Sequence, residues 1–146
     1  MPSSLTLIAV VLGGAGGALA RFGVQQFVAT RTRFDGWIAI LAINVLGSLL
    51  IGFAVGQLGE ELRHLALGTL DPGSRSFEST SLRELFAIVT VGFCGAFTTY
   101  STFALDNVLL GIDRTWLAWV NTVASITLSF FAVAAGWQLG GLVAGS

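Results

Sequence analysis

The chain has 146 residues, of which 54% are hydrophobic and only 10% are charged, and its net charge is −1. A soluble domain of this size carries about 25% charged residues, so the composition is that of an integral membrane protein and gives no support to a nucleic-acid partner. The single cysteine, Cys94, excludes an internal disulfide.

Four segments are long and apolar enough to cross a bilayer, which takes about 20 residues of helix. They are residues 5–28, 37–58, 85–110 and 116–143. The N-terminus lacks the basic region of a removable signal peptide, so we interpret it as the start of the first span. The sequence therefore predicts an all-α integral membrane protein with one transmembrane domain over residues 1–146.

Small residues recur four apart in the first two spans, as in Gly13/Gly17 and Gly52/Gly56. This spacing lets helix backbones approach closely in lipid. Packing within one subunit is enough to explain the pattern. A homo-oligomer is nevertheless expected, because four spans hardly suffice to enclose a pathway.

Two polar side chains stand out in these spans. Arg21 lies near one end of the first span, where it either reaches toward the interface or draws anions from a vestibule. Asn44 lies eight residues into the second span, between apolar neighbours. Its amide either bridges two helices or offers N–H groups to a passing anion.

The third span contains the segment GFCGAFTTYSTF at residues 92–103. Two glycines and three threonines lower its helix propensity. A break here would free backbone carbonyls, which are hard oxygen ligands for an alkali cation, at a depth where such backbone must line a cavity or be buried. The alternative is a continuous or kinked helix whose threonines bond to the preceding turn.

The fourth span carries Asn121, Ser125 and Ser129 four residues apart, which places them on one helical face. Serines in membrane helices often bond to a carbonyl of their own helix. A row of three polar side chains is also the pattern expected for the wall of a polar track.

The arginines of the connecting segments give no preferred orientation in the membrane. Arg63, Arg75 and Arg83 fall on the side of the termini and of a long loop at 59–84. Arg31, Arg33 and Arg114 fall on the other side. Orientation follows the basic residues of the loops, so a tie permits both orientations and hence an antiparallel dimer.

No enzyme site is evident, because no His, Asp, Glu or Lys lies in the middle of a span and no nucleophile–base pair or phosphate loop occurs. A dual-topology multidrug or cation exporter would need a carboxylate at mid-membrane depth, and Asp106 lies in the last third of its span. A membrane scaffold without transport activity remains an alternative.

Three segments together resemble the Fluc/CrcB fluoride channels: GGAGGALARFGV at 13–24, NVLGS at 44–48 and GFCGAFTTYSTF at 92–103. The resemblance spans all four helices. It implies a fluoride-selective passive channel of the cell (inner or plasma) membrane that exports fluoride from the cytoplasm and reduces its toxicity. It also implies a third helix with a break and an antiparallel, dual-topology homodimer.

The resemblance further implies the site residues. A structural sodium ion at the dimer centre would be held by the backbone carbonyls of Gly95 and Thr98. The anion pathway would be lined by Asn44, Tyr100, Phe103, Ser125 and Ser129, and Arg21 would lie in the vestibule. Tyr100 departs from the family, which usually has phenylalanine there. Asn121 stands where some relatives have tyrosine, and it is not included in the expected site.

Overall fold

The computed structural model describes residues 4–57 and 87–144. The predicted loop at 59–84, with Arg63, Arg75 and Arg83, lies outside the described residues. All regular elements within the described ranges are helical, as predicted. They are α1 (Ser4–Arg31), α2 (Gly36–Gln57), η1 (Ala87–Cys94), α5 (Gly95–Phe97), α6 (Tyr100–Asp113) and α7 (Thr115–Ala144).

Three of these helices are long and apolar enough to cross a membrane, namely Leu7–Arg31, Gly36–Gln57 and Thr115–Ala144. The third predicted span is not one continuous helix. It consists of η1, which is wound as a wider π-helix, followed by α5 and α6. Each of these pieces is short, so the interruption that the sequence suggested divides this span.

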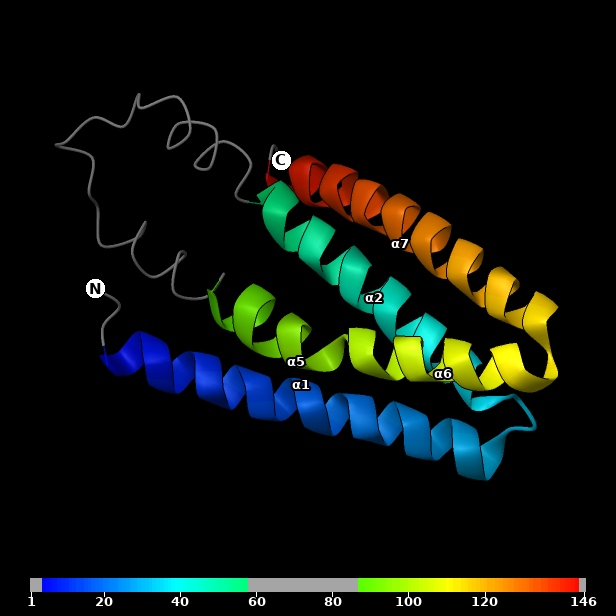
Figure 1. Ribbon diagram of the computed structural model, residues 1–146. Coiled ribbons are helices and arrows are strands. Elements are labelled where there is room, and N and C mark those ends of the chain that lie inside the picture. The colour runs from blue at the N-terminus through cyan, green and yellow to red at the C-terminus, as the bar shows by residue number, and fades with distance from the viewer. Residues whose placement is uncertain (1–3, 58–86, 145–146) are drawn as a thin grey trace, which may run out of the picture.

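The divided helix lies between α1 on one side and the pair α2 and α7 on the other (Figure 1). The start of α1 and the end of α7 point toward one end of the bundle, and the short connections α1–α2 and α6–α7 lie at the other. An ion pair joins these connections, because Nη1 of Arg114 lies 3.2 Å from Oδ2 of Asp35. The elements thus run alternately up and down.

Helices α2 and α7 make the most extensive contact in the described structure. A Cβ atom added at Gly52 would collide with the carbonyl of Val133, and one at Gly140 would collide with that of Phe53. Glycine is required at these positions because the two backbones touch. The small-residue spacing of the second span is therefore used for packing within one subunit.

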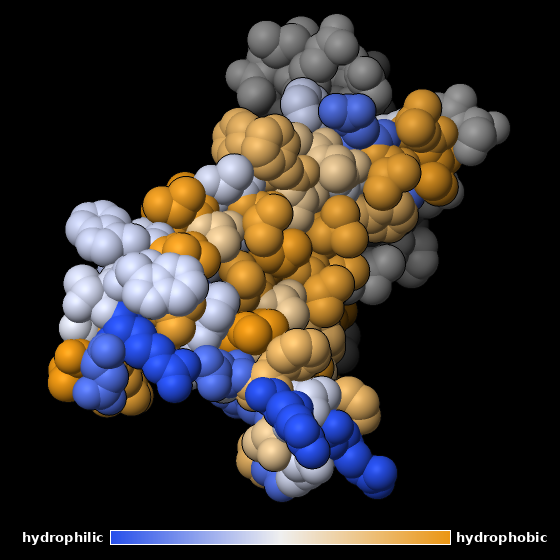
Figure 2. Space-filling model, turned by 90° about the vertical axis from the view of Figure 1, so that its right-hand side faces the viewer, coloured by the Kyte–Doolittle hydropathy of each residue, from blue (hydrophilic) through white to orange (hydrophobic). Residues whose placement is uncertain are grey.

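The buried core is small and lies where α2 meets the broken helix. Ile40, Ile43 and Phe97 form it, with Phe103 packed against its side. Most other large apolar side chains are exposed, including Leu12, Phe22 and Phe130. Figure 2 shows hydrophobic side chains over much of one face and hydrophilic ones gathered in its lower part. Such a surface suits contact with lipid or with another protein chain.

Candidate functional site

The break in the third helix is confined to two residues. Thr98 (φ −75°, ψ 155°) and Thr99 (φ −150°, ψ 119°) are extended, between α5 and α6. Thr98 is still tied to the preceding turn, since its N–H and its Oγ1 each donate to the carbonyl of Cys94 at 2.9 Å. Thr99 is thus the first residue whose N–H has no helical acceptor.

The side chain of Asn44 on α2 hydrogen-bonds both backbone groups of Thr99 at the break. Its Oδ1 accepts the N–H of Thr99 at 3.0 Å, and its Nδ2 donates to the carbonyl of Thr99 at 3.3 Å. Thr99 is 7% exposed, so these peptide groups need partners. The amide at position 44 bridges two helices, as one of the two sequence interpretations held.

The side chain of Thr99 starts the next helix. Its Oγ1 accepts the N–H of Thr102 at 3.3 Å and lies 3.1 Å from the hydroxyl of Thr102 and 3.3 Å from that of Ser101. A threonine whose oxygen accepts an N–H of the first turn is a helix N-cap. The backbone of Thr99 is therefore held by Asn44 at the break, and its side chain caps the N-terminus of α6.

The break also withdraws the helical donors of the carbonyls of Gly95 and Thr98. In a continuous α-helix the N–H of Thr99 would bond to Gly95, and the N–H of Thr102 would bond to Thr98. Here these two N–H groups donate to Asn44 and to the side chain of Thr99 instead. Gly95 is exposed and Thr98 half-buried. Both carbonyl oxygens thus become candidates for other ligands.

A pocket of about 560 Å³ lies beside the break and is named here the polar pocket. All five residues predicted for an anion pathway line it, from three helices. Thr98, which was predicted as a sodium ligand, also lines it. Its lining consists of Asn44, Ser48, Ile51, Thr98, Thr99, Tyr100, Phe103, Thr122, Ser125, Ile126 and Ser129. Arg21 of α1, half-buried, and Gly95 do not line it.

The aromatic pair of the motif forms one side of the polar pocket. The rings of Tyr100 and Phe103 have centroids 5.9 Å apart and are tilted by 43°. Tyr100 is 81% exposed, so the pocket opens to the surface of the chain at this ring. Aromatic ring edges carry partial positive charge and can contact an anion.

Gly47 allows α2 to reach the break. A Cβ atom at this position would collide with Cγ2 of Thr98. The absence of a side chain there lets Asn44 and Ser48, one turn apart, face the same pocket. The glycine of the NVLGS segment thus has a packing role at the site.

Three hydroxyl-bearing residues of the pocket were not predicted as site residues: Ser48, Thr99 and Thr122. Ser48 lies four residues after Asn44 and shares its helical face, which is a signal that the sequence contains. Thr122 is one step from the Asn121–Ser125–Ser129 row. The role of Thr99 depends on the break, and the sequence does not say which threonine ends the helix.

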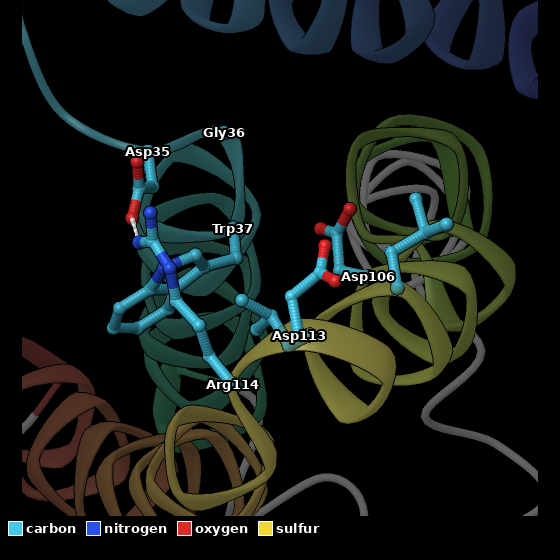
Figure 3. Close-up of a pocket in the computed structure, with 8 residues that line it drawn as sticks. Asp35, Gly36, Trp37, Asp106, Asp113 and Arg114 are labelled. Carbon is cyan, nitrogen blue, oxygen red and sulfur yellow. Dashed lines mark hydrogen bonds and ion pairs between the residues drawn. The ribbon is translucent and has the colours of Figure 1, made fainter.

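A second pocket, of about 290 Å³, lies at the end of the bundle that holds the short connections. Figure 3 shows the carboxyl groups of Asp106 and Asp113 pointing toward one another, beside the Asp35–Arg114 ion pair. Within residues 4–57 and 87–144, Oδ2 of Asp106 and Nε1 of Trp37 are buried without a hydrogen-bond partner. Asp106 thus lies toward one end of the bundle, as predicted.

The fold and the polar pocket define a small polytopic membrane protein whose broken helix places polar groups beside an open pocket. Residues 8–137 match the family described as CrcB-like protein, Camphor Resistance (CrcB). The chain belongs to this family, and the resemblance predicted from the sequence is confirmed. With three helices able to span a membrane, it is a multi-pass protein of the cell membrane.

Relatives from several organisms match nearly the whole chain. A protein of Gluconobacter oxydans named fluoride-specific ion channel FluC is 37% identical over 135 residues, covering 92% of this chain and 83% of the relative. Fluoride-specific ion channel FluC 2 of Natronomonas pharaonis is 38% identical over 137 residues, covering 93% and 95%. A FluC protein of Ignicoccus hospitalis is 34% identical over 139 residues, covering 91% and 93%.

Proposed function

We propose that this chain is a fluoride-selective passive channel that lets fluoride leave the cytoplasm and so reduces its toxicity. The observation that carries the proposal is the polar pocket, in which Asn44, Tyr100, Phe103, Ser125 and Ser129 face one space. Relatives at 37% and 38% identity are named fluoride-specific ion channels. On this proposal the chain is a transport protein and not an enzyme.

The chemistry of the pocket suits a small, strongly hydrated anion. Fluoride loses its water only at a high cost, so a narrow path must offer other donors. Asn44 uses one N–H for Thr99 and has a second on the same nitrogen. Hydroxyls of α7 and the ring edges of Tyr100 and Phe103 supply the remaining positive partial charges.

The pathway is completed by a second copy of the chain in antiparallel orientation. Tyr100 lines the pocket but is 81% exposed, so a conducting path in lipid needs a further wall at this ring. The balanced arginines allow the chain to insert either way round. A dual-topology homodimer supplies that wall to both copies by symmetry.

A structural sodium ion fits the break at the dimer axis. Its ligands would be the carbonyl oxygens of Gly95 and Thr98, whose helical donors are used elsewhere. Carbonyl oxygens are hard ligands of the type that alkali cations accept. One chain contributes two, and two chains would contribute four. The ion holds the two breaks together and takes no part in conduction.

Passive conduction is sufficient for export. Hydrogen fluoride enters as a neutral acid and dissociates at cytoplasmic pH, and the membrane potential then drives the anion outward with about 2.3 kcal/mol per charge per 100 mV. Arg21, half-buried on α1, would raise the local anion concentration at a vestibule.

The test is ion efflux from proteoliposomes loaded with fluoride or with chloride, with valinomycin to carry the balancing potassium. Rapid release of fluoride without release of chloride is the expected result. Equal release of both ions would contradict selectivity. No release of either ion from folded, dimeric protein would contradict the channel function itself, and would leave a membrane scaffold as the remaining alternative.

A further inference from the structure

A chain of side-chain hydrogen bonds runs behind the wall of the polar pocket, between α6 and α7. Ser125 Oγ donates to Oδ1 of Asn121 at 3.3 Å, and Nδ2 of Asn121 donates to Oδ1 of Asn107 at 3.2 Å. Nδ2 of Asn107 donates in turn to the carbonyl of Phe103 at 3.1 Å. Of these three side chains, only that of Ser125 lines the pocket.

The donor-to-acceptor direction of these hydrogen bonds is fixed by the last of them, from Asn107 to the carbonyl of Phe103. A backbone carbonyl can only accept, so the nitrogen of Asn107 must face Phe103 and its oxygen must face α7. That oxygen then requires a donor, which is the nitrogen of Asn121. The oxygen of Asn121 is left facing Ser125, and the only proton of the Ser125 hydroxyl points to it.

Burial makes this arrangement hard to reverse. Asn121 is 1% exposed and Ser125 is 7% exposed, so water does not replace a lost partner. Turning the amide of Asn121 over would set its oxygen against the oxygen of Asn107. Thr122 Oγ1 lies 3.2 Å from Asn107 Oδ1 and 2.9 Å from the carbonyl of Ala118, and its one proton is shared between these two acceptors.

We propose that Asn107 is a positioning residue of the anion pathway, which acts through Asn121 on the hydroxyl of Ser125. This inference rests on the proposed fluoride conduction through the polar pocket. The hydroxyl presents lone pairs to the pocket at rest, and a fluoride ion gains its proton only by breaking the Ser125–Asn121 bond. Asn107 thereby weakens fluoride binding at Ser125 and favours its release to the next donor.

The test measures fluoride flux as a function of fluoride concentration in proteoliposomes. Asn107→Leu keeps the side-chain size but removes both amide functions, so nothing stops the Asn121 amide from turning over and presenting its nitrogen to Ser125, which frees the Ser125 proton. The half-saturating fluoride concentration should fall about three- to tenfold, the value of one competing hydrogen bond. Val108→Leu, at a neighbouring exposed position of α6, serves as the matched control and should change nothing.

The decisive comparison repeats Asn107→Leu in a Ser125→Ala background. Asn107 and Ser125 share no hydrogen bond, so coupling between them must pass through Asn121. The fall in half-saturating concentration should disappear in this background. An equal fall in both backgrounds would overturn the proposal, as would a lower maximal flux at an unchanged half-saturating concentration, which is the result of a purely structural role.

Asn121→Leu interrupts the same series of hydrogen bonds at its middle residue. It tests the proposal independently if Asn107→Leu fails to fold. It removes the oxygen that holds the Ser125 proton, so it should give a fall in the same direction, again abolished by Ser125→Ala. An unchanged value would overturn the proposal. If the unsubstituted protein releases no fluoride, the proposed function is contradicted. That outcome is distinct from failure of the Asn107 proposal, which requires an active unsubstituted protein.

Discussion

The side chain of Asn44 pairs with both backbone groups of Thr99, accepting its N–H at 3.0 Å and donating to its carbonyl at 3.3 Å. An asparagine amide has the same donor and acceptor geometry as a peptide group, so this pairing copies one step of a β-ladder inside a helical protein. It explains how a break is tolerated where water is scarce.

Asn44→Leu should therefore destabilise the fold. The buried N–H of Thr99 loses its acceptor, and an unpaired buried group costs about 1–3 kcal/mol. Unfolding by denaturant in detergent micelles measures the loss. Ser48→Ala changes a neighbouring side chain of the same pocket and should cost far less. If the two variants were equally stable, the pairing would not be what supports the break.

Thr99 is expected to tolerate serine but not valine. Thr99→Val keeps the shape and removes the oxygen that caps α6, which should cost about 0.5–2 kcal/mol of unfolding free energy. Thr99→Ser keeps that oxygen and should remain near the unsubstituted protein. Circular dichroism during thermal unfolding, together with fluoride efflux, compares the two. Equal losses for serine and valine would rule out the cap as the cause.

Tyr100 should be replaceable by phenylalanine. Its ring contacts Phe103, its side chain is 81% exposed, and its hydroxyl has no hydrogen bond among the described residues. Tyr100→Phe should leave fluoride efflux within about twofold, because the ring edges are unchanged. Tyr100→Leu, which removes the ring, should lower efflux strongly. A large effect of Tyr100→Phe would assign the hydroxyl a part in conduction.

Adjacent glycines of α7 should respond oppositely to alanine. A Cβ atom at Gly140 meets the carbonyl of Phe53, whereas one at Gly141 meets nothing within 4 Å. Gly140→Ala forces α2 and α7 apart and should cost about 1–3 kcal/mol of unfolding free energy. Gly141→Ala should be neutral or slightly stabilising, since alanine favours helix over glycine. Similar stabilities would contradict the close contact of the two backbones.

The Asp35–Arg114 ion pair should contribute little. Its side chains are 52% and 58% exposed, and exposed pairs contribute about 0–1 kcal/mol. Asp35→Asn should therefore lower the free energy of unfolding by less than about 1 kcal/mol. The difference should vanish in concentrated salt, which screens exposed charges. A larger, salt-resistant loss would mean that the pair is buried in the assembled protein.

The positions of the long helices follow from the sequence, because a membrane span requires a continuous apolar segment of about 20 residues. The fourth span was predicted at residues 116–143 and α7 covers Thr115–Ala144. The segment at 92–103 also indicated a break, through its glycines and threonines. The π-helical winding of η1 was not predicted, and nothing in the sequence indicated the close contact with α1, where a Cβ atom on Gly92 would meet the backbone of Val10.

The site was partly predictable from helical periodicity and from the family resemblance. Periodicity placed Ser125 and Ser129 on one face of a helix, and family resemblance linked them to Asn44 and the aromatic pair. Neither indicated Asn107, whose importance arises only where α6 and α7 come close enough for its oxygen to meet Asn121. Asn121 departs from the family pattern and is not among the expected site residues, yet it is more deeply buried than Ser125, to which it is hydrogen-bonded.

The pairing of Asn44 with Thr99 also has a consequence for synthesis. Translation runs from residue 44 to residue 99, so the ribosome completes α2 before it reaches the break. The backbone N–H and carbonyl of Thr99 therefore emerge after Asn44, their hydrogen-bond partner, has been made. A circular permutant that started the chain at residue 87 would reverse this order. Thr99 would then be synthesised before Asn44, and its N–H would have no partner until α2 had been made.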